Sequence, residues 1–257
     1  MEYTISNGIL TARVNARGAE LCSLIYEGAE YIWQAGKEWP RSAPVCCPWC
    51  GVVDGGKFEH GGRTYAAGRH GFVRDCVHGL VDRSEDGLTF QFAVEGFQDD
   101  RWPWPFALTA HYALKADTLA LTYSISNAGT ETMPLQLGFH PGFIAPEGSS
   151  IRAGKSELPG GSDTLPVVTG TFDNDSMCVV HPASDWFALE RPDGRSVTLD
   201  TRGFDYVLLW GVPGNTPFVC IEPWTGYPGP GGMFDRPGVI SLEPGEKMER
   251  TLTIKLG

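Results

Sequence analysis

The sequence predicts an all-β protein, a large antiparallel β-sandwich, on three observations. The 257 residues include 33 Gly and 19 Pro, about a fifth of the chain, and both residues break helix interiors. Apolar residues recur at every second position in several segments, as in strands with one buried face. Two further segments are apolar at every position, which is typical of strands covered on both faces.

The alternating segments predict most of the strands. Residues 88–94 and 106–114 alternate apolar with small or polar side chains. After a short polar turn the alternation resumes over residues 119–125, so the pattern predicts a β-hairpin. Residues 248–256 repeat the alternation and predict a strand at the C-terminus.

The two continuously apolar segments are Tyr206–Trp210 and residues 218–221, joined by a connection rich in Gly and Pro. We expect them in the middle of a layered structure. Residues 146–170 are rich in Gly, Ser and Pro and are expected to form a long surface loop. No linker or shift in composition divides the chain, so we expect one domain over residues 1–257.

The net charge and the lack of targeting signals indicate which partners and which compartment to expect. Lys and Arg number 20 against 31 Asp and Glu, a formal net charge of −11, which disfavours nucleic acids and anionic membranes. The N-terminal residues lack the pattern of a secretory signal, and no apolar run approaches the length of a membrane span. Seven cysteines, an odd number, indicate reduced thiols. We therefore expect a cytoplasmic protein that binds neither nucleic acid nor membrane.

Glu222 is the first candidate for chemistry. It follows the apolar strand at residues 218–221 and precedes Pro223, which we expect to end the strand and hold Glu222 extended. Desolvation at the edge of an apolar layer raises a carboxyl pKa and suits a general base near neutral pH. The alternative is an exposed glutamate just past the strand.

Two histidines are the next candidates. His140 ends an alternating strand and precedes Pro141, and an imidazole there can give or take a proton near neutral pH. The alternative is a structural histidine bonded to a carbonyl. His70 lies with Arg74 in residues 69–75, a group of donors suited to hydroxyl groups. The alternative there is a salt-linked loop.

The cysteines and glycines give weaker signals. Cys47 and Cys50, next to Cys46, have the C-x-x-C spacing of a redox dithiol or half of a zinc site. No second ligand pair with zinc spacing follows and a βαβ context is lacking, so we favour buried small side chains at these positions. Residues 226–232 match no nucleotide-binding pattern. Aromatic residues near turns, such as Trp39 and Trp224, suit stacking on sugars, although interior packing explains them equally well.

Taken together, these segments resemble the aldose 1-epimerase (galactose mutarotase-like) family, in particular its bacterial mutarotase-related branch. The similar segments come in the family's order: residues 39–51 with Arg41, residues 69–75, residues 139–143, residues 172–175 and residues 218–224. The chain departs from the family at Cys46, Cys47 and Cys50, where apolar residues are usual. Asp175 is the least secure match, because Asp205 is a rival for its position.

The resemblance implies a supersandwich fold. It also implies that the protein interconverts the α and β anomers of a free hexose without a cofactor or metal. We expect a monomer or homodimer. Glu222 would take the proton of the anomeric hydroxyl, and His140 would protonate the ring oxygen. The residues that would hold the sugar hydroxyls are His70, Arg41, Arg74 and Asp175.

Three alternatives stay open. A hexose-6-phosphate 1-epimerase shares the acid and base and would need a basic pocket, which Arg41, Arg69 and Arg74 could supply. A non-catalytic carbohydrate-binding protein would keep the fold without needing the acid and base together. A cysteine redox protein is the third.

Overall fold

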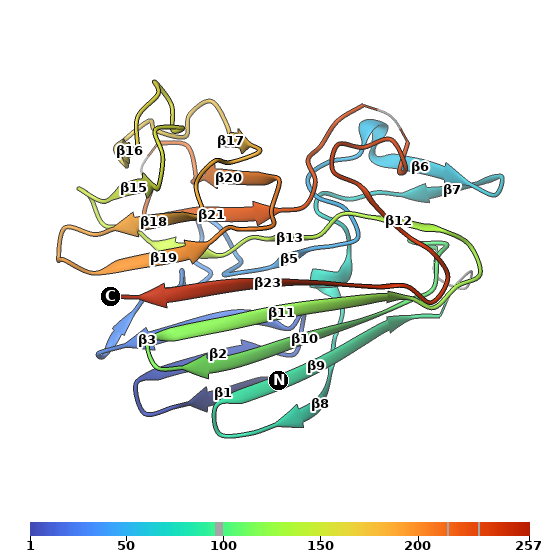
Figure 1. Cartoon of the computed structure of the whole chain (residues 1–257), viewed down its shortest axis with the longest axis horizontal. Coiled ribbons are helices and arrows are strands. Elements are labelled where there is room, and N and C mark those ends of the chain that lie inside the picture. The colour runs from blue at the N-terminus through green and yellow to red at the C-terminus, as the bar shows by residue number, and fades with distance from the viewer. Residues whose placement is uncertain (96–99, 215, 231) are drawn as a thin grey trace.

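The computed structural model describes residues 1–95, 100–214, 216–230 and 232–257 (Figure 1). Within these ranges the chain is built from antiparallel strands, and its helical segments are two short 3-10 helices, η1 (Asp54–Gly56) and η2 (Val73–Asp75). The prediction of an all-β protein is therefore confirmed. No helix in the described ranges is long and apolar enough to cross a bilayer.

The largest sheet has nine strands in the order β16-β15-β18-β19-β23-β11-β10-β9-β8. The predicted hairpin is confirmed, because β10 and β11 pair from Phe106↔Asn127 to Lys115↔Thr118. The strands are β8 (Gly79–Arg83), β9 (Gly87–Val94), β10 (Phe106–Lys115), β11 (Thr118–Asn127), β15 (Ser150–Ala153), β16 (Thr164–Pro166), β18 (Trp186–Glu190), β19 (Ser196–Asp200) and β23 (Lys247–Leu256).

The second large sheet carries the two continuously apolar segments. Its order is β17-β20-β21-β13-β5, and β14 also pairs with β21. The strands are β5 (Val45–Cys46), β13 (Gly138–Phe139), β14 (Gly142–Ile144), β17 (Met177–Val180), β20 (Tyr206–Trp210) and β21 (Phe218–Trp224). Every residue of β21 is buried, as are the first four of β20. This confirms that both segments lie in the middle of a layered structure.

Three smaller sheets complete the described part of the fold. One has four strands in chain order, and two are pairs, β12 with β22 and β6 with β7. The strands are β1 (Glu2–Ser6), β2 (Leu10–Asn15), β3 (Glu20–Tyr26), β4 (Ala29–Glu30), β6 (Lys57–His60), β7 (Arg63–Ala66), β12 (Met133–Leu135) and β22 (Ile240–Leu242).

The two large sheets face each other across the core. The ring of Tyr123 on β11 packs against that of Phe139 on β13, with ring centroids 5.2 Å apart. Both side chains are about 99% buried, each with a relative exposure of 1%, and burying one large apolar side chain contributes roughly 1.5–3 kcal/mol. The strand that ends at Phe139 is thereby fixed immediately before His140.

One expectation about loops is wrong in part. Residues 146–170 contain β15 and β16, which pair with each other at the edge of the nine-stranded sheet. Ile151 and Ala153 of β15 are buried, and β15 also pairs with β18. The two strands are only four and three residues long and lie between segments rich in Gly and Pro, so the sequence pattern did not predict them.

Candidate active site

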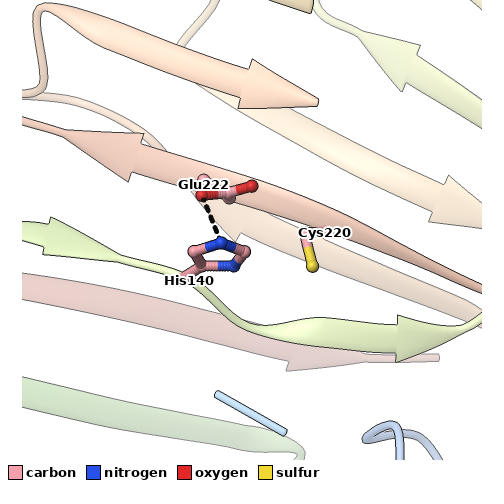
Figure 2. A group of neighbouring side chains, drawn as sticks. All are labelled: His140, Cys220 and Glu222. Atoms are coloured by element: carbon pink, nitrogen blue, oxygen red, sulfur yellow. Dashed lines mark ion pairs between the residues drawn. The ribbon is translucent and has the colours of Figure 1, made fainter. Parts of the chain in front are cut away.

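The structure brings His140 and Glu222 together from segments far apart in the chain. Glu222 lies on β21, and His140 lies in the two-residue break between β13 and β14. His140 Nε2 is 3.2 Å from Glu222 Oε2 (Figure 2). Their side chains are 8% and 2% exposed, so the contact is shielded from bulk water.

Pro223 does not end the strand, contrary to our expectation. β21 continues to Trp224, and Pro223 pairs with Val207 of β20. The other edge of β21 changes partner here, from β14 at Cys220 to β13 at Trp224. A proline is tolerated because this position has no ladder partner on that edge. Glu222 is therefore held by a strand interior and not by a strand end.

Aromatic rings enclose the His140 imidazole. The Trp39 indole is stacked on it, with centroids 5.0 Å apart and an interplanar angle of 26°. Trp210 and His70 approach it edge-on, at 5.9 and 5.2 Å. The Trp210 contact was not predicted from local pattern, and the stacking of Trp39 on His140 depends on tertiary structure. These rings restrict the imidazole to one orientation.

Burial sets the protonation of the pair. It raises the pKa of Glu222 well above the usual carboxyl range, with a further contribution from Asp175. It lowers the pKa of His140 to about 3, and the nearby Arg74 and Arg41 act in the same direction. Both effects favour uncharged groups. The neutral carboxyl and the neutral imidazole are therefore the favoured forms of the two groups, whose nearest atoms lie 3.2 Å apart.

A cavity of about 610 Å³ opens above the pair. Its wall includes every residue that the sequence analysis proposed for the site: Glu222, His140, His70, Arg41, Arg74 and Asp175. The rival Asp205 lies elsewhere, because its side chain is 61% exposed and pairs with His181 at 3.5 Å. The structure therefore favours Asp175 over Asp205 as the aspartate of this cavity.

His70 is held in an unusual backbone conformation. Its φ of +64° lies in the left-handed region that non-glycine residues rarely adopt. Its backbone N–H donates to Gly51 O at 2.7 Å, and its carbonyl accepts from the Cys47 N–H at 3.2 Å. Such conformations are retained where the surroundings enforce them, often at functional sites.

One wall of the cavity is cationic. It contains Arg41, Arg69 and Arg74. Arg41 pairs with Asp75 at 2.6 Å, and Arg74 donates to the Arg69 carbonyl at 2.7 Å. The Arg74 Nε is buried and donates to no acceptor in the described ranges. This wall suits sugar oxygens and also anionic groups.

Trp224 supplies a donor that the sequence analysis did not identify. Its side chain lines the cavity, and its indole N–H is buried without an acceptor in the part of the chain that the structure describes. A buried donor without a partner is costly.

Only one group of three potential metal ligands is found among the described residues: His140, Glu222 and Cys220, whose donor atoms lie within 4.8 Å of one another (Figure 2). Nitrogen, oxygen and sulfur donors of this kind suit zinc. Burial, and next the Glu222 carboxylate, raise the pKa of Cys220 well above its usual range, which opposes the thiolate that a metal requires. The cationic wall opposes a cation as well. The donor set therefore fits a metal poorly.

The C-x-x-C residues lie in two apolar clusters. Cys47 packs in the main core, and Cys46 and Cys50 pack with Trp224 in a smaller cluster. All seven cysteines are free. Burial raises the pKa of all three of these thiols, which makes them poor nucleophiles. This arrangement supports the interpretation as buried small side chains.

Comparison with known proteins agrees with this geometry. The family described as aldose 1-epimerase matches residues 1–172. The chain is 29% identical over 266 residues to the chromosomal protein LacX of Lactococcus lactis subsp. lactis, with 88% of each chain covered. A galactose mutarotase-like protein from Lactobacillus casei superposes with a TM-score of 0.91 at 26% identity over 100% of both chains. A galactose mutarotase related enzyme from Lactobacillus acidophilus gives 0.92 at 25% identity, over 100% of this chain and 97% of that one. The fold is thus galactose mutarotase-like along its whole length.

Proposed function

Because the chain belongs to the aldose 1-epimerase family, we propose that it interconverts the α and β anomers of a free hexose by general acid–base ring opening. The observation that carries the proposal is the His140–Glu222 contact of 3.2 Å beside a cavity of about 610 Å³. The reaction needs one base and one acid within reach of a single hemiacetal.

The proposed reaction needs one proton on the pair, which a neutral Glu222 carboxyl beside a neutral His140 imidazole would supply. Transfer of this proton from Glu222 to His140 gives a carboxylate and an imidazolium. The carboxylate takes the proton of the anomeric hydroxyl while the imidazolium protonates the ring oxygen, and the C1–O5 bond breaks. The aldehyde rotates about its bond to C2, and the reverse transfers close the ring on its other face. The pair ends each cycle with the one proton it began with.

The cavity wall would orient the sugar. His70, Arg41 and Arg74 supply donors, and Asp175 supplies an acceptor. Holding C1 and O5 between the acid and the base is worth more to the rate than affinity alone. The proposed steps need only these side chains and no cofactor.

Saturation-transfer NMR on freely mutarotating hexoses tests the proposal. Catalysis appears as faster magnetisation exchange between the α and β anomeric protons. We expect exchange with the wild-type protein and none above background with Glu222→Gln. A wild-type protein that binds a hexose but leaves exchange of every aldose at background would instead indicate a carbohydrate-binding protein of this fold.

The cationic wall favours one second candidate, a hexose-6-phosphate 1-epimerase. Arg69 and Arg74 line the same cavity as the acid–base pair, and guanidinium groups bind phosphate through paired N–H donors. The same NMR experiment with glucose and glucose 6-phosphate separates the two. Preference for the phosphate that disappears in Arg69→Gln would assign the second function.

We further propose that residues 1–257 act as one cytoplasmic domain, as a monomer or homodimer. One cluster of buried apolar side chains includes members from Ile5 to Leu256, which supports a single domain. The seven free thiols support a reducing compartment.

A further inference from the structure

A buried guanidinium lies behind the cavity wall without a carboxylate partner. Arg236 is 3% exposed, and no Asp or Glu of the described ranges lies within ion-pair distance of it. Its Nη1 donates to Val52 O at 2.9 Å, its Nη2 to Cys50 O at 2.7 Å and its Nε to Gln136 Oε1 at 3.2 Å. Burying a charge is costly, and this charge is met by the three hydrogen bonds and by the more distant carboxylate of Asp54.

One peptide unit connects Arg236 to His70. The Cys50 carbonyl that accepts from Arg236 belongs to the peptide between Cys50 and Gly51. The N–H at the other end of that peptide is the Gly51 N–H, which donates to His70 Nδ1 at 3.0 Å. A cation at the carbonyl oxygen polarises the peptide and strengthens its N–H as a donor.

Gln136 holds both Arg236 and the preceding peptide, between Trp49 and Cys50. Its Oε1 accepts from the Cys50 N–H at 3.1 Å as well as from Arg236. Its Nε2 donates to Tyr227 O at 3.2 Å and Pro237 O at 2.8 Å. The 50–51 peptide itself is bonded to Arg236 at its carbonyl and to His70 at its N–H, so it cannot rotate without breaking bonds to two buried side chains.

We propose that Arg236 is a positioning residue that acts through the 50–51 peptide to hold His70 as the neutral tautomer with its hydrogen on Nε2. A nitrogen that accepts a hydrogen bond carries no hydrogen, so the Gly51 donor assigns Nδ1 as the acceptor. The ring hydrogen then lies on Nε2, the only other ring nitrogen. Burial lowers the pKa of His70 to about 2, and His140 and Arg74 add to this effect. His70 is therefore neutral and supplies one donor of fixed direction.

The consequence for sugar binding rests on the proposed function. His70 lines the cavity beside His140, with ring centroids 5.2 Å apart. A fixed Nε2–H can donate to a sugar oxygen, whereas the other tautomer would present an acceptor there. The tautomer therefore decides whether this part of the wall recognises a lone pair or a hydroxyl hydrogen.

Histidine ¹⁵N NMR tests the tautomer without any assay of activity. The His70 signals are assigned by their loss in His70→Gln. In the wild-type protein near pH 7 we expect a protonated Nε2, an unprotonated Nδ1 and a ¹⁵N–¹⁵N coupling across the Gly51–His70 hydrogen bond. A protonated Nδ1, or no coupling, would overturn the proposal.

Variants at Arg236 test its part in the relay. Arg236→Met should give a mixture of both His70 tautomers. Arg236→Lys keeps a charged donor for Cys50 O and should preserve most of the wild-type signal, and it remains informative if the methionine variant does not fold. Arg202→Met, at an exposed arginine that pairs with Asp200, is the matched control and should change nothing. A folded Arg236→Met protein with the wild-type His70 spectrum contradicts the role of Arg236, and so does an Arg236→Lys protein whose spectrum has lost the Nε2-protonated form.

Kinetics add a second readout if anomer exchange is observed. Losing one oriented donor should raise KM about tenfold in Arg236→Met. The pH dependence of kcat, which the His140–Glu222 pair sets, should stay unchanged. A shifted pH profile with an unchanged KM would contradict the proposal. Absence of exchange in the wild-type protein would count against the proposed function and leave the NMR result standing.

Discussion

The Trp39 indole lies nearly parallel to the His140 imidazole, at an interplanar angle of 26° and a centroid distance of 5.0 Å. The face of an indole attracts a cation. The contact therefore stabilises the imidazolium form of His140, which burial and the arginine wall disfavour. Within the proposed reaction, Trp39 helps His140 to accept the proton that it must then give to the ring oxygen.

Replacing Trp39 by leucine should slow the proposed reaction while His140 stays in place. Loss of a cation–π contact of about 1 kcal/mol or more predicts a fall in kcat of roughly five- to thirtyfold. Saturation-transfer NMR measures this fall. Trp186→Leu is the control, because Trp186 is 37% exposed on β18 and away from the cavity wall. Equal rates for the two variants would show that stacking contributes nothing to the acid.

Glu222→Gln should remove activity and increase stability at alkaline pH. The folded protein raises the pKa of Glu222 above 4.5, so the stability that this group contributes is present below pH 4.5 and is lost as pH rises through the folded pKa. A neutral amide escapes this loss. We expect the variant to exceed the wild type by about 1–3 kcal/mol at pH 8 and by much less at pH 4.5. Urea unfolding at the two pH values measures the difference, and a gain independent of pH would refute the assignment.

His140→Asn should make the protein less sensitive to acid. The pKa of His140 falls from 6.5 to about 3 on folding, so the unfolded chain binds the additional proton first. The stability that neutral His140 contributes is present above pH 6.5 and is lost as pH falls towards 3. Between pH 6.5 and 4 the free energy of unfolding should therefore fall more in the wild type than in the variant. The difference between the two losses should be on the order of a few kcal/mol. Parallel stability curves would contradict the pKa direction. The variant should keep weak sugar binding and lose most of the rate.

Gly51→Ala should damage the cavity wall more than its backbone conformation alone explains. Gly51 has φ +68°, and an added Cβ would lie 2.0 Å from Pro228 Cγ. Gly55→Ala is the matched control, because Gly55 has φ +66° with nothing within 4 Å of the added carbon. Strain from positive φ costs both variants about 1–2 kcal/mol. Only Gly51→Ala should lose a further 1–3 kcal/mol from the clash, measured by thermal or urea unfolding. Equal losses would mean that Pro228 moves freely.

The chemistry-bearing residues could be predicted because local pattern marks them. Glu222 and His140 each precede a proline, and Glu222 follows a continuously apolar segment whereas His140 follows an alternating one. The structure places both beside one cavity. The strand end expected at Pro223 was wrong, because the change of neighbour from β14 to β13 is a long-range property. A local sequence pattern does not show which strand lies beside β21 at Pro223.

Other parts of the site depend on tertiary packing alone. Trp210 ends an apolar strand, a pattern typical of a core residue, yet its ring packs edge-on against that of His140. Arg236 lies in a loop rich in Gly and Pro and reads as a surface residue, yet it is 3% exposed. Two of its three acceptors are backbone carbonyls, at residues 50 and 52, and every sequence possesses such groups. Burial of this kind follows from how distant loops meet.

Glu222 lies in a strand and His140 in a two-residue break between two strands, whereas most of the remaining cavity wall comes from longer segments outside the strands. Residues 39–41, 69–70, 175–176 and 227–228 belong to connections, while Glu222 belongs to a fully buried strand whose residues 220–224 pair with β20. The residues proposed for proton transfer and most of the residues that would select the sugar thus lie on different segments, which can be changed separately by protein engineering. Grafting new loops at these four segments offers a way to redirect the scaffold to other carbohydrates without rebuilding its proton-transfer machinery.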